Sequence, residues 1–261
     1  MAVLTLLVKA RNPKQLQLVD DLLKSEFENL DLDAKVLGTP ANSWVQISLS
    51  GEDEAVATNY LEKEIGTCPV SIKRVEKASV LKGYVTELDA ADGLVKVDVG
   101  VFEPKVHLAV IPLSVLQAQL AGEKKVDLKK IAEAYGLHEK LPLKVKVAEL
   151  PTSDNGERLM AELSPEQVEK FRLWQQSLLD RLVVLGSTAG DVEQTLQRTG
   201  LKRDVIEVER LGFFEFALTC KFGTDAAGLI PRLGRYMRGA VFVVFTPRRL
   251  SGLIGEMPLT L

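Results

Sequence analysis

Five short strand-like stretches follow one another between residues 82 and 163, while the segments on either side alternate strands with helices. Apolar and polar residues alternate within these stretches, as in Leu94–Val99, and turn residues such as Ala91-Asp92-Gly93 separate them. Five strands with an insertion between the third and the fourth are typical of a small Greek-key barrel. The sequence therefore predicts a β-barrel domain over residues 79–163, with a helical insertion, and this barrel divides the chain into three parts.

The first part, residues 1–78, is predicted to be a ferredoxin-like α+β domain with the element order βαββαβ. Asn12-Pro13 supplies an N-cap and a proline at the first helical position, which predicts a helix that ends near Glu28. The final strand is expected at Val70–Val75.

The third part, residues 164–261, is predicted to be a linker helix followed by a second ferredoxin-like α+β domain. Ser164-Pro165 begins the linker helix, and the order βαββαβ then returns. Its last helix is expected over residues 224–238, broken or kinked at Pro231. The predicted fold class is α+β: one ferredoxin-like unit, a small β-barrel, and a second ferredoxin-like unit.

Composition excludes several classes of protein. The 261 residues carry 33 Lys plus Arg against 36 Asp plus Glu, so the chain is not a globally basic nucleic-acid coat. Two histidines and two isolated cysteines, Cys68 and Cys220, predict neither a metal site nor a disulfide framework, and no cofactor motif is present. The expected protein is cytoplasmic, without a leader or a membrane span.

The predicted outer face of the barrel carries a first set of candidate RNA-binding residues. Val95, Val97 and Val99 are expected to face inward on one strand, and Val106 on the next, which leaves cations and rings outside. A row of lysines with a little stacking capacity suits an RNA backbone, although lysine is also common on solvated strands. The candidates are Lys82, Tyr84, Lys96, Lys105, His107, Lys144 and Lys146.

A second candidate set lies in the C-terminal part, where Asp225 is the only acid between residues 221 and 255. Arginines three residues apart share one side of a helix, and arginine makes forked contacts with phosphate. The alternative is a solvated face paired with carboxylates elsewhere, such as those of the first part, which has twelve acidic and nine basic residues. This set consists of Arg232, Arg235, Arg238, Arg248 and Arg249.

Two further motifs favour structural roles. Phe213-Phe214-Glu215-Phe216 could stack bases, but its alternation with Leu218 favours packing in a core. Gly186-Ser187-Thr188-Ala189-Gly190 could hold an anion, but a helix N-cap at Thr188 is the favoured interpretation. His107 and His138 have no Cys, Ser or carboxylate at a catalytic spacing, so no catalytic residue and no enzymatic activity is predicted.

The middle segment resembles the S1 branch of the OB-fold. The resemblance rests on Lys82-Gly83-Tyr84-Val85, on Asp92–Gly100, on Lys144–Val147 and on the hairpin Asp154–Leu159. It implies an RNA-binding barrel. Where S1 domains carry an aromatic residue and a histidine for base stacking, this chain has Leu94 and Val110.

The whole chain also resembles an uncharacterised archaeal family, a domain of unknown function. That resemblance rests on Cys220–Gly234 and on the ending Val-Phe-Thr-Pro247, and it implies an archaeal, cytoplasmic protein.

The first functional hypothesis is a non-enzymatic RNA-binding protein of the archaeal information-processing machinery. It would contact the RNA backbone through the barrel and the C-terminal arginines, with salt-dependent affinity. The alternative is a protein–protein adaptor or scaffold that uses the acidic first part or the apolar tail Leu250–Leu261. The sequence leaves the identity of the RNA, the protein partner and the oligomeric state open.

Overall fold

The computed structural model describes residues 1–122, 124–152 and 158–249. They form two compact units. Unit 1 contains residues 1–75 together with residues 99–107, and unit 2 contains the other described residues. The apolar tail Leu250–Leu261 lies outside the described residues.

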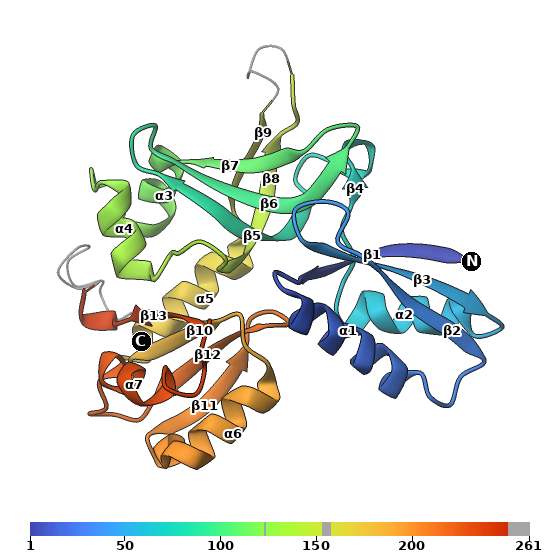
Figure 1. Ribbon diagram of the computed structural model, residues 1–261. Coiled ribbons are helices and arrows are strands. Elements are labelled where there is room, and N and C mark those ends of the chain that lie inside the picture. Colours follow the sequence, from blue (N-terminus) through green and yellow to red (C-terminus); the bar gives the residue numbers. More distant parts are fainter. Residues whose placement is uncertain (123, 153–157, 250–261) are drawn as a thin grey trace. The chain divides into compact units, whose positions relative to one another are not determined.

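Unit 1 is built on a three-stranded antiparallel sheet of order β1-β3-β2 with two helices packed on it (Figure 1). Asn12 caps α1, because its side-chain oxygen accepts a hydrogen bond from the backbone N–H of Gln15 at 2.9 Å. The core contains fully buried side chains such as Leu6, Val19 and Trp44. The elements are β1 (Ala2–Lys9), α1 (Pro13–Glu26), β2 (Leu32–Gly38), β3 (Trp44–Gly51), α2 (Glu54–Glu64), β4 (Val70–Ser71) and η1 (Ile72–Arg74).

The predicted final strand at Val70–Val75 is wrong in its extent. Thr67 forms an antiparallel bridge with Leu6 at the edge of β1, and the N–H of Cys68 donates to the carbonyl of Thr5 at 2.8 Å. Pro69 has no N–H, and Val70 has a φ of 63°, so the ladder ends there. Strand β4 instead pairs in parallel with Val101 and Glu103 of β6.

The barrel consists of five strands, as predicted, and it is closed. Strand β5 pairs with β6 and β8, β8 pairs with β9, and β7 pairs in parallel with β9 and also with β6. This arrangement is OB-like, with the helical insertion between β7 and β8 (Figure 1). The elements are β5 (Val80–Asp89), β6 (Leu94–Glu103), β7 (His107–Pro112), α3 (Leu113–Leu120), α4 (Leu128–Tyr135), β8 (Pro142–Glu149) and β9 (Leu159–Leu163).

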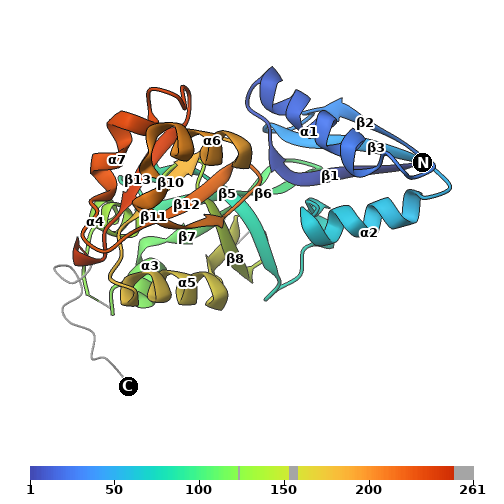
Figure 2. The ribbon, with the colours of Figure 1, turned by 90° about the horizontal axis from the view of Figure 1, so that it is seen from below.

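The C-terminal part of unit 2 has an antiparallel sheet of order β11-β12-β10-β13, with α6 and α7 on one face. Figure 2 shows α5 on the opposite side of this sheet. Ser164 caps α5 through a hydrogen bond from the N–H of Gln167 at 3.2 Å. The elements are α5 (Pro165–Gln176), β10 (Arg181–Leu185), α6 (Ala189–Thr199), η2 (Leu201–Arg203), β11 (Val205–Arg210), β12 (Glu215–Cys220), α7 (Ala226–Leu233) and β13 (Val241–Phe245).

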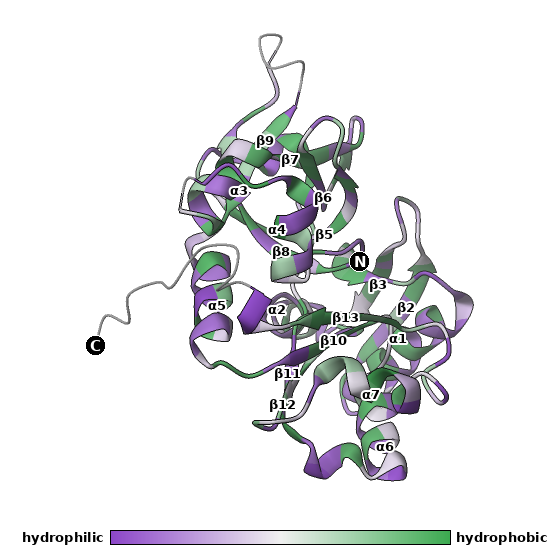
Figure 3. Cartoon of the chain, turned by 90° about the vertical axis from the view of Figure 1, so that its left-hand side faces the viewer, coloured by the Kyte–Doolittle hydropathy of each residue, from purple (hydrophilic) through white to green (hydrophobic). Residues whose placement is uncertain are grey.

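Burial on both faces explains the apolar strands of this sheet. Every residue of β10 and β12 is buried, and β12 and β13 are coloured mainly hydrophobic in Figure 3. A row of edge-to-face rings joins three elements: Tyr135 of α4 contacts Phe171 of α5, and Trp174 of α5 contacts Phe245 of β13, both with ring centroids 5.3 Å apart. These contacts fix α5 between the insertion of the barrel and the C-terminal sheet.

Candidate nucleic-acid interface

The turn between β12 and α7 presents an exposed aromatic ring. Phe222 is 80% exposed, which is unusual for a phenylalanine in a folded domain. The N–H of Thr224 donates to the carbonyl of Lys221 at 2.9 Å, and Gly223 has a φ of +85°, which closes the turn around the ring. The carboxylate of Asp225 caps α7 by accepting from the N–H of Ala227 at 3.0 Å.

Two arginines share a pocket with this ring, which we call the Phe222 pocket. It has a volume of about 340 Å³, and Lys221, Arg248 and Arg249 line it together with Phe222. The carboxylates of Asp180 and Asp225 also line it. None of the three cations forms an ion pair with a residue that the structure describes. The pocket therefore combines an exposed aromatic face with a small excess of positive charge, since three cations face two carboxylates and none is held in an ion pair among the described residues.

The predicted arginine helix is wrong in part. Helix α7 contains Pro231 and ends at Leu233, so only Arg232 lies on it, while Arg235 and Arg238 lie in the turns that follow. The Arg232 guanidinium donates to the carbonyl of Thr199 at the end of α6, where it satisfies a free helix carbonyl. Arg235 and Arg238 are exposed and have no ion pair within the described part of the chain.

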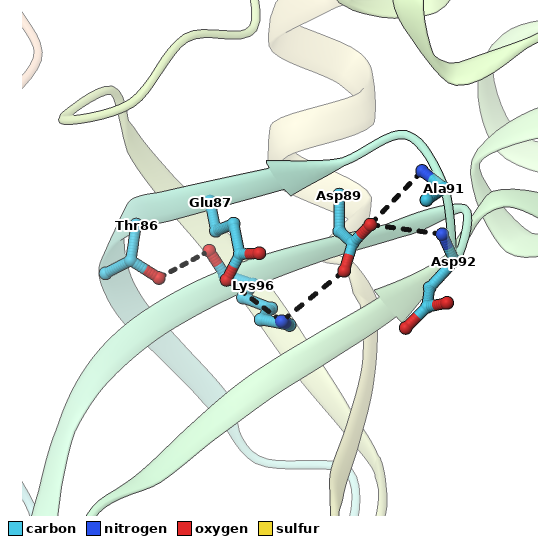
Figure 4. Close-up of polar contacts among 6 residues, drawn as sticks. All are labelled: Thr86, Glu87, Asp89, Ala91, Asp92 and Lys96. Atoms are coloured by element: carbon cyan, nitrogen blue, oxygen red, sulfur yellow. Dashed lines mark hydrogen bonds and ion pairs between the residues drawn. The ribbon is translucent and has the colours of Figure 1, made fainter.

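The barrel lysines are mostly neutralised by carboxylates. Lys96 contacts Glu87 at 2.9 Å and Asp89 at 3.6 Å (Figure 4), and the hydrogen bond with Glu87 raises the pKa of Lys96 above its ordinary value. In β8, Lys144 pairs with Glu166 at 2.5 Å, and Lys146 pairs with Glu162 at 3.0 Å. These ion pairs leave little free charge for a phosphate backbone.

Tyr84 and Lys82 do not lie on a solvated face. Tyr84 is 1% exposed, and its hydroxyl donates to the Glu215 carboxylate at 3.2 Å. Lys82 is partly buried in a separate pocket. The prediction of an outward-facing Tyr84 is wrong because this stretch of β5 is covered on both faces.

His107 is also buried rather than outward-facing. It is 7% exposed, whereas Val106 is 48% exposed, the reverse of the predicted arrangement. Strand β7 begins at His107, and His107, Ala109 and Ile111 share its buried face, since a shift of one residue moves every side chain to the other face. Lys105 is exposed in the segment that precedes β7.

The two motifs with favoured structural roles behave as predicted. Phe214 and Phe216 are 1% and 3% exposed, so they belong to the core. The Thr188 hydroxyl accepts from the N–H of Asp191 at 3.0 Å and caps α6. Sequence reasoning overlooked Phe222 itself, although a phenylalanine between a lysine and a glycine in a turn was a usable signal.

Among the described residues, no three histidines, cysteines or carboxylates form a group that could hold a metal ion. No helix in this part of the chain is long and apolar enough to cross a membrane.

Three domain models of a single family match successive parts of the chain. The DUF2110 N-terminal domain matches residues 4–71, the DUF2110 central domain residues 75–175, and the DUF2110 C-terminal domain residues 179–245. None of the curated proteins compared with the chain matches it.

Proposed function

This chain belongs to the DUF2110 family, and we propose that it binds single-stranded RNA, without catalysing a reaction, through the Phe222 pocket. The observation that carries the proposal is the exposed Phe222 ring beside three cations that have no ion pair among the described residues. Single-stranded nucleic acid is bound by this pairing, in which a base stacks on the ring and the cations follow the backbone.

The C-terminal arginines and the barrel lysines differ in their ion pairs, and this difference favours the Phe222 pocket as the RNA-binding site. Removal of counterions from phosphates drives RNA binding, and only a cation that is free to approach a phosphate contributes. Lys96, Lys144 and Lys146 would first have to leave their carboxylates. Arg248 and Arg249 are exposed and can contact a phosphate directly. The C-terminal arginines therefore lead the proposed contact, and the barrel acts mainly as a support.

A cytoplasmic location is part of the proposal. Cys68 and Cys220 are both buried and form no disulfide with each other, which suits a reducing compartment. The resemblance of Cys220–Gly234 to an archaeal family supports an archaeal source, and a role in information processing follows from RNA binding in that setting.

The second candidate function is a protein–protein adaptor, which one observation favours. Strand β11 lies at an edge of the C-terminal sheet, and Ile206 and Val208 on it are 57% and 41% exposed. An exposed apolar edge strand can pair with a strand of another chain.

The proposal can be tested by fluorescence anisotropy at low and moderate salt. The probes are a labelled oligouridine and a labelled hairpin RNA. We expect Phe222→Ala to weaken oligouridine binding about tenfold, since stacking of one base is worth about 1–3 kcal/mol. The double variant Arg248→Ala/Arg249→Ala should bind both RNAs more weakly than the wild type does. The matched control, Lys96→Ala/Lys146→Ala, removes two cations that are already paired and should bind nearly as the wild type does.

Two results would overturn the proposal. One is the absence of binding to either RNA at low salt. The other is an equal loss in the control and in the arginine variant, which would show that net charge rather than the Phe222 pocket matters. Circular dichroism of each variant confirms that the fold is retained.

A further inference from the structure

A second pocket lies in unit 2, between the barrel strands β5 and β8, helix α5 and the end of β11. Its volume is about 320 Å³, at the lower end of the range of small-molecule sites. Four cations line this pocket, and apolar wall is supplied by side chains such as Leu141 and Trp174. The cations are Lys82, Lys144, Lys170 and Arg210. We call it the Lys82 pocket.

Two of the four cations are already neutralised. Lys144 pairs with Glu166 at 2.5 Å, and Glu166 lines the same pocket. Lys170 pairs with Glu209 at 2.6 Å, and that carboxylate also accepts a hydrogen bond from the Trp174 indole at 3.1 Å. These two pairs leave the charge of the pocket to the remaining two cations, Lys82 and Arg210.

Lys82 has no ion pair or hydrogen bond through its ammonium group among the described residues. Burial lowers the pKa of Lys82 below its ordinary value, and Glu215 opposes that effect only in part. The Glu215 carboxylate already accepts from the Tyr84 hydroxyl and from the N–H of Phe214, each at 3.2 Å. A desolvated, unpaired ammonium destabilises a folded protein, so its presence in a pocket indicates a role in binding.

Arg210 is held in place at the same pocket. Its Nε donates to the carbonyl of Gly212 at 3.2 Å, and its guanidinium carbon lies 5.3 Å from the centroid of the Phe213 ring. No ion pair involves it within the described residues. The terminal nitrogens of a guanidinium oriented in this way suit the forked recognition of a phosphate.

We propose that the Lys82 pocket binds a small phosphate monoester, with its phosphate held by Lys82 and Arg210 and its organic body against the apolar wall. An ammonium and a guanidinium without carboxylate partners together match the double negative charge of a phosphate monoester. The volume of the pocket limits the ligand to a small metabolite. This site is separate from the Phe222 pocket and does not depend on RNA binding.

Phenyl phosphate, inorganic phosphate and neutral phenol are the probes for the test. The chain has two tryptophans, and Trp174 lines the Lys82 pocket whereas Trp44 belongs to unit 1. We expect saturable binding of phenyl phosphate by calorimetry, with a change in tryptophan fluorescence that is absent in Trp174→Phe. Inorganic phosphate should compete, and phenol alone should not bind.

The decisive variant is Lys82→Met, which keeps an unbranched side chain one atom shorter and removes its charge. We expect it to weaken phenyl phosphate binding at least tenfold, about the worth of one charge-assisted hydrogen bond. The matched control is Lys146→Met, the same substitution at a barrel lysine paired with Glu162 outside the pocket, and it should bind as the wild type does.

Three outcomes would overturn the proposal. The first is no saturable binding of phenyl phosphate to the wild type, and the second is equal affinity in Lys82→Met and the wild type. The third is a marked fall in the melting temperature of ligand-free Lys82→Met, which would show that Lys82 serves as a structural partner of Glu215. If the protein binds phenyl phosphate but no RNA, the proposed function is refuted and the proposal for the Lys82 pocket stands.

Discussion

The hydroxyl of Tyr84, on barrel strand β5, donates a hydrogen bond to the carboxylate of Glu215, at the start of β12, over 3.2 Å. Both residues are nearly inaccessible to solvent, with exposures of 1% and 3%. The Glu215 carboxylate also accepts from the N–H of Phe214. A buried carboxylate needs such donors, so this contact fixes the barrel against the C-terminal sheet.

Tyr84→Phe should destabilise the protein by about 1–3 kcal/mol, because it removes one donor from a buried carboxylate. Urea unfolding, followed by circular dichroism, measures this change in the free energy of unfolding. Tyr60→Phe is a suitable control, since that hydroxyl contacts Glu26 in an exposed position and its loss should change stability little. Equal effects of the two variants would contradict the structural role given to Tyr84.

Gly100→Ala should be among the most disruptive small substitutions in unit 1. Gly100 has a φ of +74°, and a Cβ there would lie 2.4 Å from the sulfur of Cys68. Gly200 is a matched control, because its φ is +69° and nothing lies within 4 Å of its Cβ position. Both variants share the backbone strain, so overpacking should make the free energy of unfolding of Gly100→Ala lower than that of Gly200→Ala by about 1–3 kcal/mol. Thermal unfolding measures this difference.

Cys220 should make the protein less stable at high pH. Burial raises the pKa of Cys220 to about 11, from an ordinary value of 9. The unfolded thiol therefore loses its proton between about pH 9 and pH 11, while the folded thiol keeps it, so folding stability is complete below pH 9 and declines as the pH rises toward 11. Guanidinium unfolding at pH 8 and pH 10 should show a smaller decline for Cys220→Ala than for the wild type. An identical decline in both proteins would refute this assignment.

The salt dependence of RNA binding should identify the cations in contact with phosphate. For single-stranded RNA, each phosphate contact contributes about 0.7 to the slope of log K against log salt. Arg248→Ala/Arg249→Ala should therefore reduce the magnitude of that slope by about 1.4. A slope unchanged in this variant would place the phosphate contacts elsewhere.

Local signals in the sequence were sufficient to predict most of the fold. The caps at Asn12 and Ser164 are satisfied within the next three residues, so the chain near each helix start determines them. Alternation likewise located the five barrel strands. The fourth strand of the first domain was predicted too long and in the wrong sheet. Only Thr67 bridges to β1, and β4 pairs with β6, a partner about 30 residues away that local sequence does not reveal.

The candidate site was harder to predict, because the availability of a charge depends on contacts distant in sequence. Lys144 is neutralised by Glu166, which lies 22 residues further along the chain, and no sequence pattern reports that pairing. The burial of Tyr84 depends on Glu215, 131 residues away. Arg248 and Arg249 were predicted as binding residues from local charge, and they lie at a pocket whose aromatic ring was overlooked.

Strand β6 has a consequence for any attempt to shorten the chain. Its residues from Val99 onward belong to unit 1, where Val101 pairs with Val70 and Gly100 lies against Cys68. A fragment that stops at residue 75 would lack these residues, and Cys68 and Val70 would lose neighbours that the complete chain provides. A fragment truncated between the first and second family domains should therefore be incompletely packed. An N-terminal fragment that folds by itself would also have to include residues 99–107.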